Sequence, residues 1–272
     1  DMTPQDLAER LKALKGGRIL LVEDNDLNQQ VASEILSEAG LLVDVADHGE
    51  IAVRMVQQAA YDVVLMDMQM PVMDGVTATR EIRKITRFAS LPIIAMTANA
   101  MQADRERCAS VGMNDFISKP IDPDQLWRVL LSWCKPTAGK VVVAAPVVAR
   151  DPEALPSNVP GLDTEAGLRL TMGKKKLYLS VLRKFVKGHK NTAQEIALAL
   201  DAGDWETAER VAHTTKSTSS YAGAAGINTL ALAIEHAAKE RRARAEMDPL
   251  LAQLGEQLSK LISALETQLP PE

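Results

Sequence analysis

Five short apolar runs alternate with amphipathic stretches through the first half of the chain. The apolar runs are residues 18–22, 42–46, 63–66, 93–96 and 116–117. The stretches with helical spacing are residues 27–39, 50–58, 76–85, 103–111 and 123–133. Apolar strands that alternate with helices are typical of a parallel sheet covered on both faces. The pattern therefore predicts an α/β, doubly wound, flavodoxin-like sheet of five parallel strands in the order 2-1-3-4-5.

Polar residues follow four of these predicted strands. Glu23 and Asp24 follow the first, Asp67 ends the third, Thr97 follows the fourth and Lys119 follows the fifth. Because the carboxyl ends of parallel strands share one edge of a sheet, we expect these side chains to lie together. Asp67 is the candidate reacting residue, since VVLMDMQMPVMDG delivers its carboxylate to that edge. Taken alone, an Asp at a strand end could equally be a turn or helix-cap residue.

Three carboxylates at one edge would raise each other's pKa values unless a cation lies among them. Oxygen ligands of this kind suit Mg²⁺. The predicted ligands are Asp24, Asp67 and the backbone carbonyl of Gln69, with Glu23 acting through water. Such a site could neutralise phosphoryl oxygens while Asp67 attacks phosphorus, with Lys119 and Thr97 supplying positive charge and a donor.

Other readings of this half fit the residues less well. A dinucleotide fold needs a glycine-rich turn after the first strand, whereas Gly16 and Gly17 precede that strand. A phosphatase with an Asp nucleophile would usually need a second carboxylate two residues later, where this chain has Gln69.

The segments LLVEDN, LMDMQMPVMDG, MTA and SKP resemble the signature of the response-regulator receiver domain. The resemblance covers residues 18–134. It implies that Asp67 is the phosphoacceptor, that Lys119 and Thr97 assist, and that Phe116 is an aromatic switch moving with Thr97. Ordinary core packing is the other reading of Phe116. Within the chain, we assign residues 17–135 to this domain and residues 1–16 to an N-terminal linker helix.

A proline-rich segment, residues 136–161, separates this half from an all-helical remainder, residues 162–272. Its five prolines predict neither continuous helix nor central strand, so we interpret it as a tether. The helices expected after it are residues 164–171, 174–187, 191–202, 204–222, 227–242 and 248–268. Short connections between helices predict an antiparallel four-helix bundle.

His213 lies on the predicted helix that starts at Asp204, on a face expected to meet water. Lys216 follows one turn later, and Ser217 and Ser220 keep the surroundings small. A histidine there would be a nitrogen nucleophile at neutral pH, or simply a solvated surface residue. AHTTKSTSSYAGA resembles the histidine-phosphotransfer (HPt) domain, which implies that His213 accepts and donates a phosphoryl group and that Lys216 assists.

A receiver followed by an HPt domain resembles the C-terminal part of a bacterial hybrid sensor histidine kinase. The resemblance implies a phosphorelay protein of a two-component system, with an upstream kinase domain in the same parent chain and a downstream receiver that docks at His213. The alternative is a phosphorylation-controlled binding switch whose helical bundle only mediates interaction or dimerisation. We find no ATP site, so an enzymatic role is limited to the receiver catalysing its own phosphorylation.

Composition sets further limits. The charge of −5 resides in the first half, which gives no basic footprint for nucleic acid. No apolar run is long enough to span a membrane, and Cys108 and Cys134 have no metal-ligand spacing. We expect a cytoplasmic fragment without membrane contact, whose parent protein could be anchored in the inner membrane.

Overall fold

The computed structural model describes residues 9–98, 102–135 and 155–269, and divides the chain into two compact units, Asp1–Ala149 and Arg150–Glu272. Each unit is considered by itself. No helix in these described ranges is long and apolar enough to cross a membrane. The first half of the expected linker helix over residues 1–16, residues 1–8, lies outside them; residues 9–16 are described, and Leu14 is buried.

The first unit is built on a five-stranded parallel sheet, as predicted. Its strands are β1 (Arg18–Val22), β2 (Leu42–Ala46), β3 (Val63–Asp67), β4 (Ile93–Thr97) and β5 (Asp115–Ser118). They pair in the order β2-β1-β3-β4-β5, which confirms the expected order. Every residue of β3 and β4 is buried, because helices cover both faces of these central strands.

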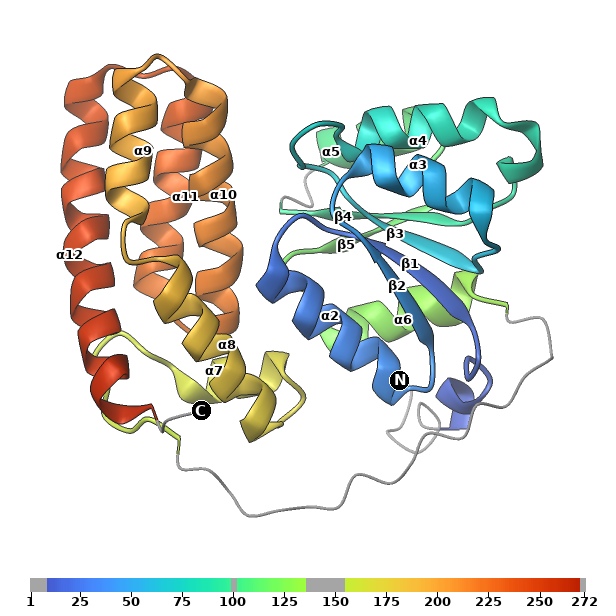
Figure 1. The fold of residues 1–272 in the computed structure, drawn as a ribbon, viewed down its shortest axis with the longest axis horizontal. Coiled ribbons are helices and arrows are strands. Elements are labelled where there is room, and N and C mark those ends of the chain that lie inside the picture. Colours follow the sequence, from blue (N-terminus) through green and yellow to red (C-terminus); the bar gives the residue numbers. More distant parts are fainter. Residues whose placement is uncertain (1–8, 99–101, 136–154, 270–272) are drawn as a thin grey trace. The chain divides into compact units, whose positions relative to one another are not determined.

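Five helices cover the sheet. They are α2 (Asp26–Glu38), α3 (Gly49–Gln58), α4 (Gly75–Lys84), α5 (Gln102–Ser110) and α6 (Pro123–Trp133), with a 3-10 turn at Thr86–Phe88. Figure 1 shows α3, α4 and α5 on one face and α2 and α6 on the other. Asn25 and Asp74 explain two of the starts, because their side chains accept hydrogen bonds from the first backbone N–H groups of α2 and α4.

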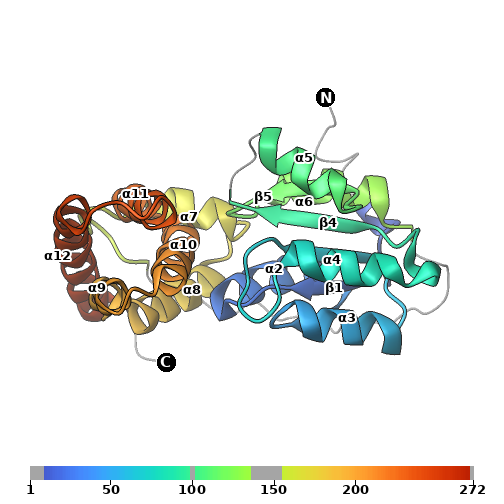
Figure 2. The same cartoon turned by 90° about the horizontal axis from the view of Figure 1, so that it is seen from above.

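The second unit is all-helical. Its helices are α7 (Thr164–Leu170), α8 (Lys175–Gly188), α9 (Thr192–Asp201), α10 (Trp205–Ala222), α11 (Ala225–Lys239) and α12 (Arg244–Gln268). Neighbouring pairs α9–α10, α10–α11, α11–α12 and α12–α9 close a ring of four helices, which Figure 2 shows end-on. The predicted four-helix bundle is therefore present, with α7 and α8 packed onto it.

Two details of the second unit differ from the sequence predictions. Helix α12 begins at Arg244 and not at residue 248, with Pro249 inside it. Arg244 stabilises this earlier start because its guanidinium pairs with Asp201 at 2.6 Å and also with Asp248. The end of the predicted tether packs on the bundle: the Ser157 N–H donates to Gln268 at 2.9 Å. Residues 136–154 of that tether lie outside the described residues.

Candidate functional site

The carboxyl edge of the sheet brings together the predicted polar residues. Asp67 is the last residue of β3, Thr97 the last residue of β4, and Lys119 follows β5. Backbone hydrogen bonds fix the loops: the Lys119 N–H donates to the Thr97 carbonyl at 2.7 Å. The Glu23 N–H likewise donates to the Ala46 carbonyl at 3.1 Å, which continues the β1–β2 pairing by one residue. The strand register therefore positions these groups.

Lys119 links two of the predicted carboxylates. Its Nζ lies 2.6 Å from Oδ2 of Asp67 and 2.6 Å from Oε2 of Glu23, and all three side chains are almost fully buried. The other Glu23 oxygen, Oε1, accepts hydrogen bonds from Asn28 Nδ2 at 3.1 Å and from the Asn25 N–H at 3.2 Å. Both oxygens of Glu23 are thus engaged by protein groups, which the sequence analysis did not foresee.

The surroundings of Asp67 oppose its ionisation. Burial raises the pKa of Asp67 to about 8; Lys119 pulls it down, and the neighbouring charges of Glu23 and Asp24 push it up. For Lys119, burial acts to lower the pKa, but the carboxylates of Asp67 and Glu23 outweigh it and raise the pKa above its usual value. Lys119 therefore stays positively charged, and its charge favours the ionised form of the adjacent Asp67 carboxyl group.

The loop after β3 closes tightly over Asp67. The Gln69 N–H donates to Asp67 Oδ1 at 3.2 Å, and the Gly75 N–H donates to the Met68 carbonyl at 3.3 Å. A Cβ at Gly75 would lie only 2.2 Å from the Asp67 carbonyl oxygen, so a residue with a side chain would displace the backbone here. Gly75 therefore allows α4 to begin directly above the candidate reacting residue.

Three carboxylates at this edge form a set that could hold a cation. Oxygens of Glu23, Asp24 and Asp67 all lie within 4.8 Å of one another. Hard oxygen donors of this kind fit Mg²⁺. Since both oxygens of Glu23 already accept hydrogen bonds or pair with Lys119, Asp24 and Asp67 are the better candidates for direct ligands.

Phe116, the predicted switch, lies on β5 and is partly buried against the hydrophobic core of the first unit. Arg105 of α5 covers its ring, with Cζ 4.3 Å from the ring centroid, a distance at which a cation interacts with an aromatic face. β5 pairs with β4 so that Phe116 is opposite Ala95, two residues before Thr97. The contact with Arg105 was not predicted.

In the bundle, the prediction that His213 faces water is wrong. Only 6% of its surface is exposed, and its Nδ1 lies 2.7 Å from Oε1 of Glu235 on α11. Lys216 and Ser217 are also buried, with exposures of 9% and 3%. Periodicity placed these residues correctly on one face of α10, but the adjacent helix α11 reaches that face with a carboxylate.

Glu235 was missed by the sequence analysis. It joins the two predicted residues, because Oε1 pairs with His213 and Oε2 accepts from Lys216 Nζ. Burial alone would raise the pKa of Glu235, but the hydrogen bonds from His213 and Lys216 and the electrostatic attraction of these two groups hold it below its usual value. A usable signal exists in the sequence: Glu235 is the one acidic residue of the helix AGINTLALAIEHAAK.

A carboxylate that accepts from Nδ1 fixes the tautomer of the His213 ring. With the proton on Nδ1, the lone pair is on Nε2, which becomes the nucleophilic atom. Lys216 balances the charge of Glu235 and is itself held close to the ring by that pair. This arrangement suits a histidine that attacks an electrophile through Nε2.

His189, which directly follows α8, is a structural residue of the bundle. It is 6% exposed and pairs with Thr192 Oγ1 at 2.9 Å and Thr218 Oγ1 at 2.7 Å. Burial lowers its pKa to about 4, so the ring is neutral at physiological pH. It therefore joins α8, α9 and α10 and has no role in the chemistry above.

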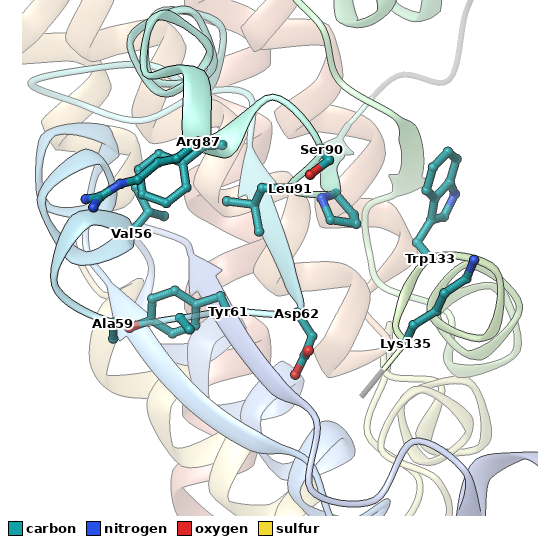
Figure 3. Close-up of a pocket in the computed structure, with 12 residues that line it drawn as sticks. Val56, Ala59, Tyr61, Asp62, Arg87, Ser90, Leu91, Trp133 and Lys135 are labelled. Carbon is teal, nitrogen blue, oxygen red and sulfur yellow. The ribbon is translucent and has the colours of Figure 1, made fainter. Parts of the chain in front are cut away.

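A surface hollow of about 380 Å³ in the first unit lies away from this chemistry. It is lined by Tyr61, Asp62, Arg87, Trp133 and Lys135 among others, as Figure 3 shows. Asp62 directly precedes β3, so the hollow is at the amino ends of the strands and Asp67 is at the carboxyl ends. It contributes nothing to the candidate site.

Comparison with protein-family models gives two matches. Residues 19–131 match the response regulator receiver domain, and residues 180–268 match the Hpt domain. Together the two matches include Asp67 and His213. The alternative of a bundle that serves only for interaction is therefore not favoured.

Curated relatives share these parts. The sensor protein GacS of Pseudomonas syringae pv. syringae is 40% identical over 170 residues, covering 61% of this chain and 18% of that protein. BarA of Escherichia coli K12, a signal transduction histidine-protein kinase, is 27% identical over 244 residues, covering 89% of this chain and 26% of BarA. The chain thus spans only a minor part of the length of these two relatives. The response regulator ORR41 of Oryza sativa subsp. japonica is 45% identical over 117 residues, covering 42% of this chain and 91% of ORR41.

Two solved structures are among those that match parts of the chain. The receiver domain of the sensor histidine kinase PA1611 from Pseudomonas aeruginosa PAO1, solved with a magnesium ion in its active-site cleft, is 47% identical (TM-score 0.41) and covers 43% of this chain and 97% of that one. A co-crystal structure of the Saccharomyces cerevisiae phosphotransfer protein Ypd1 with the Ssk1 receiver matches at 26% identity (TM-score 0.42), covering 44% of this chain and 90% of that one.

Proposed function

Because this chain belongs to the two-component phosphorelay proteins and joins a response regulator receiver domain to an Hpt domain, we propose that Asp67 and His213 are its two phosphoacceptors. In the first step, a carboxylate oxygen of Asp67 attacks the phosphorus of a phosphohistidine. An O–P bond forms, the N–P bond of the donor breaks, and the donor imidazole leaves. In the second step, Nε2 of His213 attacks a receiver acyl phosphate, an N–P bond forms, and the aspartate carboxylate leaves.

The observation that carries the Asp67 assignment is the Lys119 bridge. Lys119 holds a positive charge 2.6 Å from Asp67 at the open edge of the sheet. A cation fixed before the reaction stabilises the charge that the phosphoryl oxygens bring to this edge, without reorganisation at the moment of transfer. The hydroxyl of Thr97, at the end of the neighbouring strand, is proposed as an additional donor to those oxygens.

Mg²⁺ is the proposed cofactor of the receiver. Asp24, Asp67 and the backbone carbonyl of Gln69 would hold it, with Glu23 acting through water. When bound, the ion supplies charge neutralisation for the phosphoryl oxygens. The closeness of the three carboxylates, within 4.8 Å, supports this assignment.

The His213 assignment is supported by its contact with Glu235. A histidine ring oriented by a carboxylate presents one defined nitrogen, as a nucleophile requires. Lys216 is proposed to assist by stabilising the negative charge of the incoming phosphoryl group. The proposed partners are a histidine kinase domain that phosphorylates Asp67 and a receiver that exchanges with His213. For Phe116, we propose that its ring moves with Thr97 when Asp67 is phosphorylated.

The proposal is tested with labelled acetyl phosphate and Mg²⁺ on the whole chain and on the Asp67→Asn and His213→Ala variants. Acyl phosphates are labile in base, whereas phosphohistidine is labile in acid, so the two products separate. Base-stable label that needs both Asp67 and His213 supports the relay. Label on Asp67 alone in every active variant would mean that His213 is not an acceptor for this receiver.

A further inference from the structure

Charge is segregated along this chain to an unusual degree. Residues 19–53 contain eight Asp and Glu and no Lys or Arg, whereas residues 166–191 contain eight Lys and Arg and no Asp or Glu. The whole chain has 31 basic and 36 acidic residues, so both segments depart strongly from its average. A surface that carries charge of one sign attracts oppositely charged partners and disfavours partners of like charge.

The basic segment centres on helix α8. Lys176, Arg183 and Lys187 are spaced by seven and then four residues, which places them on one face of the helix. Lys176 and Lys187 are exposed and Arg183 is half-buried, while Leu182 and Phe185 turn inward and are fully buried. We call Lys176, Arg183 and Lys187 the α8 basic stripe.

The α8 basic stripe belongs to a helix that is fastened to the helix carrying His213. The Tyr178 hydroxyl on α8 donates to the Ala222 carbonyl of α10 at 2.7 Å. Just beyond the other end of α8, His189 pairs with Thr218 of α10 at 2.7 Å. A protein bound to the stripe would therefore be held beside the phosphoacceptor helix on a rigid support.

The acidic segment includes helix α2, which begins two residues after Asp24. Asp26, Glu34 and Glu38 on this helix are exposed and spaced by eight and then four residues. Helix α2 thus presents carboxylates from its first turn to its last, beginning beside the proposed acceptor site. The sign and number of these charges complement those of the α8 basic stripe.

We propose that the α8 basic stripe is the docking surface for the acidic α2 helix of a receiver domain on a second copy of this chain. The inference rests on the proposed relay and identifies the surface that recognises the receiver. Opposite charges would raise the rate of encounter and the affinity at low salt, and screening would weaken both as salt increases.

The test uses two full-length variants that report only on association between molecules. The donor carries His213→Gln together with Lys176→Gln and Lys187→Gln, and the acceptor carries Asp67→Asn together with Glu34→Gln and Glu38→Gln. The two molecules can then dock only through α2 of the donor and the α8 basic stripe of the acceptor. Binding of a fluorescently labelled donor is measured at about 20 mM and about 300 mM NaCl, a range over which the screening length falls severalfold. The acceptor is then given Lys176→Glu and Lys187→Glu. The matched control reverses two exposed basic residues at the end of α11, Lys239→Glu and Arg241→Glu.

We expect the α8 reversal to weaken binding at least tenfold at low salt, and the difference to disappear at high salt. The control pair should bind within twofold of the parent. Reversal of the partner surface, Glu34→Lys and Glu38→Lys in the donor, should restore binding to the reversed acceptor.

Equal weakening by the control, unchanged binding after the α8 reversal, or no association of the parent pair at low salt would each overturn the docking proposal. Phosphoryl transfer is followed separately on the parent pair. A pair that binds but passes no phosphoryl group from Asp67 to His213 would rule out transfer between copies and leave the docking surface standing. The proposed function itself is tested by label on Asp67 and His213 in the acetyl phosphate experiment.

Discussion

Glu235 on α11 accepts a hydrogen bond from Nδ1 of His213 on α10 at 2.7 Å, across 22 positions of sequence. The same carboxylate pairs with Lys216, so one buried acidic group orients both residues proposed to act in the bundle. The contact links the fold of the bundle to the proposed chemistry, because it decides which nitrogen of the ring would attack in the proposed relay.

Replacement of Glu235 by Gln should slow phosphoryl transfer to His213 by about 10- to 100-fold, since a hydrogen bond to a charged group contributes about 1.5–3 kcal/mol. The neutral amide can still contact the ring but no longer favours one tautomer. Transfer is measured by label on His213, and ¹⁵N shifts of the ring report the tautomer. Glu240→Gln, an exposed residue near the end of the same helix, is the control. A normal rate in Glu235→Gln with a mixed tautomer would contradict the role.

Replacement of Lys119 by Met should reduce phosphorylation of Asp67 by about 100-fold or more, the usual cost of removing one fixed donor from such a site. Without the cation, the pKa of Asp67 should move further upward, because burial and Glu23 would then act unopposed. Incorporation of label from acetyl phosphate at pH 7 measures the effect. Lys135→Met removes an exposed lysine from the same unit and should leave incorporation unchanged. Circular dichroism distinguishes loss of chemistry from loss of fold.

Substitution of Gly75 by Ala should destabilise the first unit by about 1–3 kcal/mol, as overpacking at a closely packed site does. The new Cβ would lie 2.2 Å from the Asp67 carbonyl oxygen, so β3 or the start of α4 must shift. Urea unfolding measures the change. Gly188→Ala is the control, because a Cβ added at Gly188 has no neighbouring atom within 4 Å; this substitution should be neutral or slightly stabilising. Equal effects of the two substitutions would show that close approach is not the cause.

Acidification should destabilise the bundle through His189. Its pKa is about 4 in the folded protein against about 6.5 when unfolded, because burial disfavours the charged ring. Between these values the unfolded state binds a proton that the folded state does not, so stability falls as the pH falls. The free energy of unfolding is expected to fall by about 2 kcal/mol between pH 7 and pH 5.

The measurement is urea unfolding at both pH values, followed by the fluorescence of Trp205 in a Trp127→Phe, Trp133→Phe background. In the His189→Gln variant the free energy of unfolding should no longer fall by this amount between pH 7 and pH 5, whatever its value at pH 7. In the control His236→Asn, which removes an exposed histidine, the fall should be the same as in the parent. The same pH dependence in His189→Gln and the parent would rule out His189 as its source.

The fold of the first unit and most of its site could be predicted from the sequence. Strand order and the gathering of Asp67, Thr97 and Lys119 follow from one topological rule, because the carboxyl ends of parallel strands meet at one edge. The hydrogen bonds that Asn25 and Asn28 make to Glu23 were not predicted, since they depend on how α2 turns away from β1.

In the bundle, the sequence by itself determined the helices and which residues share a face of α10. Only the tertiary structure decided that Glu235 meets His213, that His189 is buried beside Thr218, and that His213 is not open to water. The physical reason is that helical periodicity orders residues around one axis and carries no information about which neighbouring helix covers a given face. That choice is made by the packing of side chains distant in the sequence.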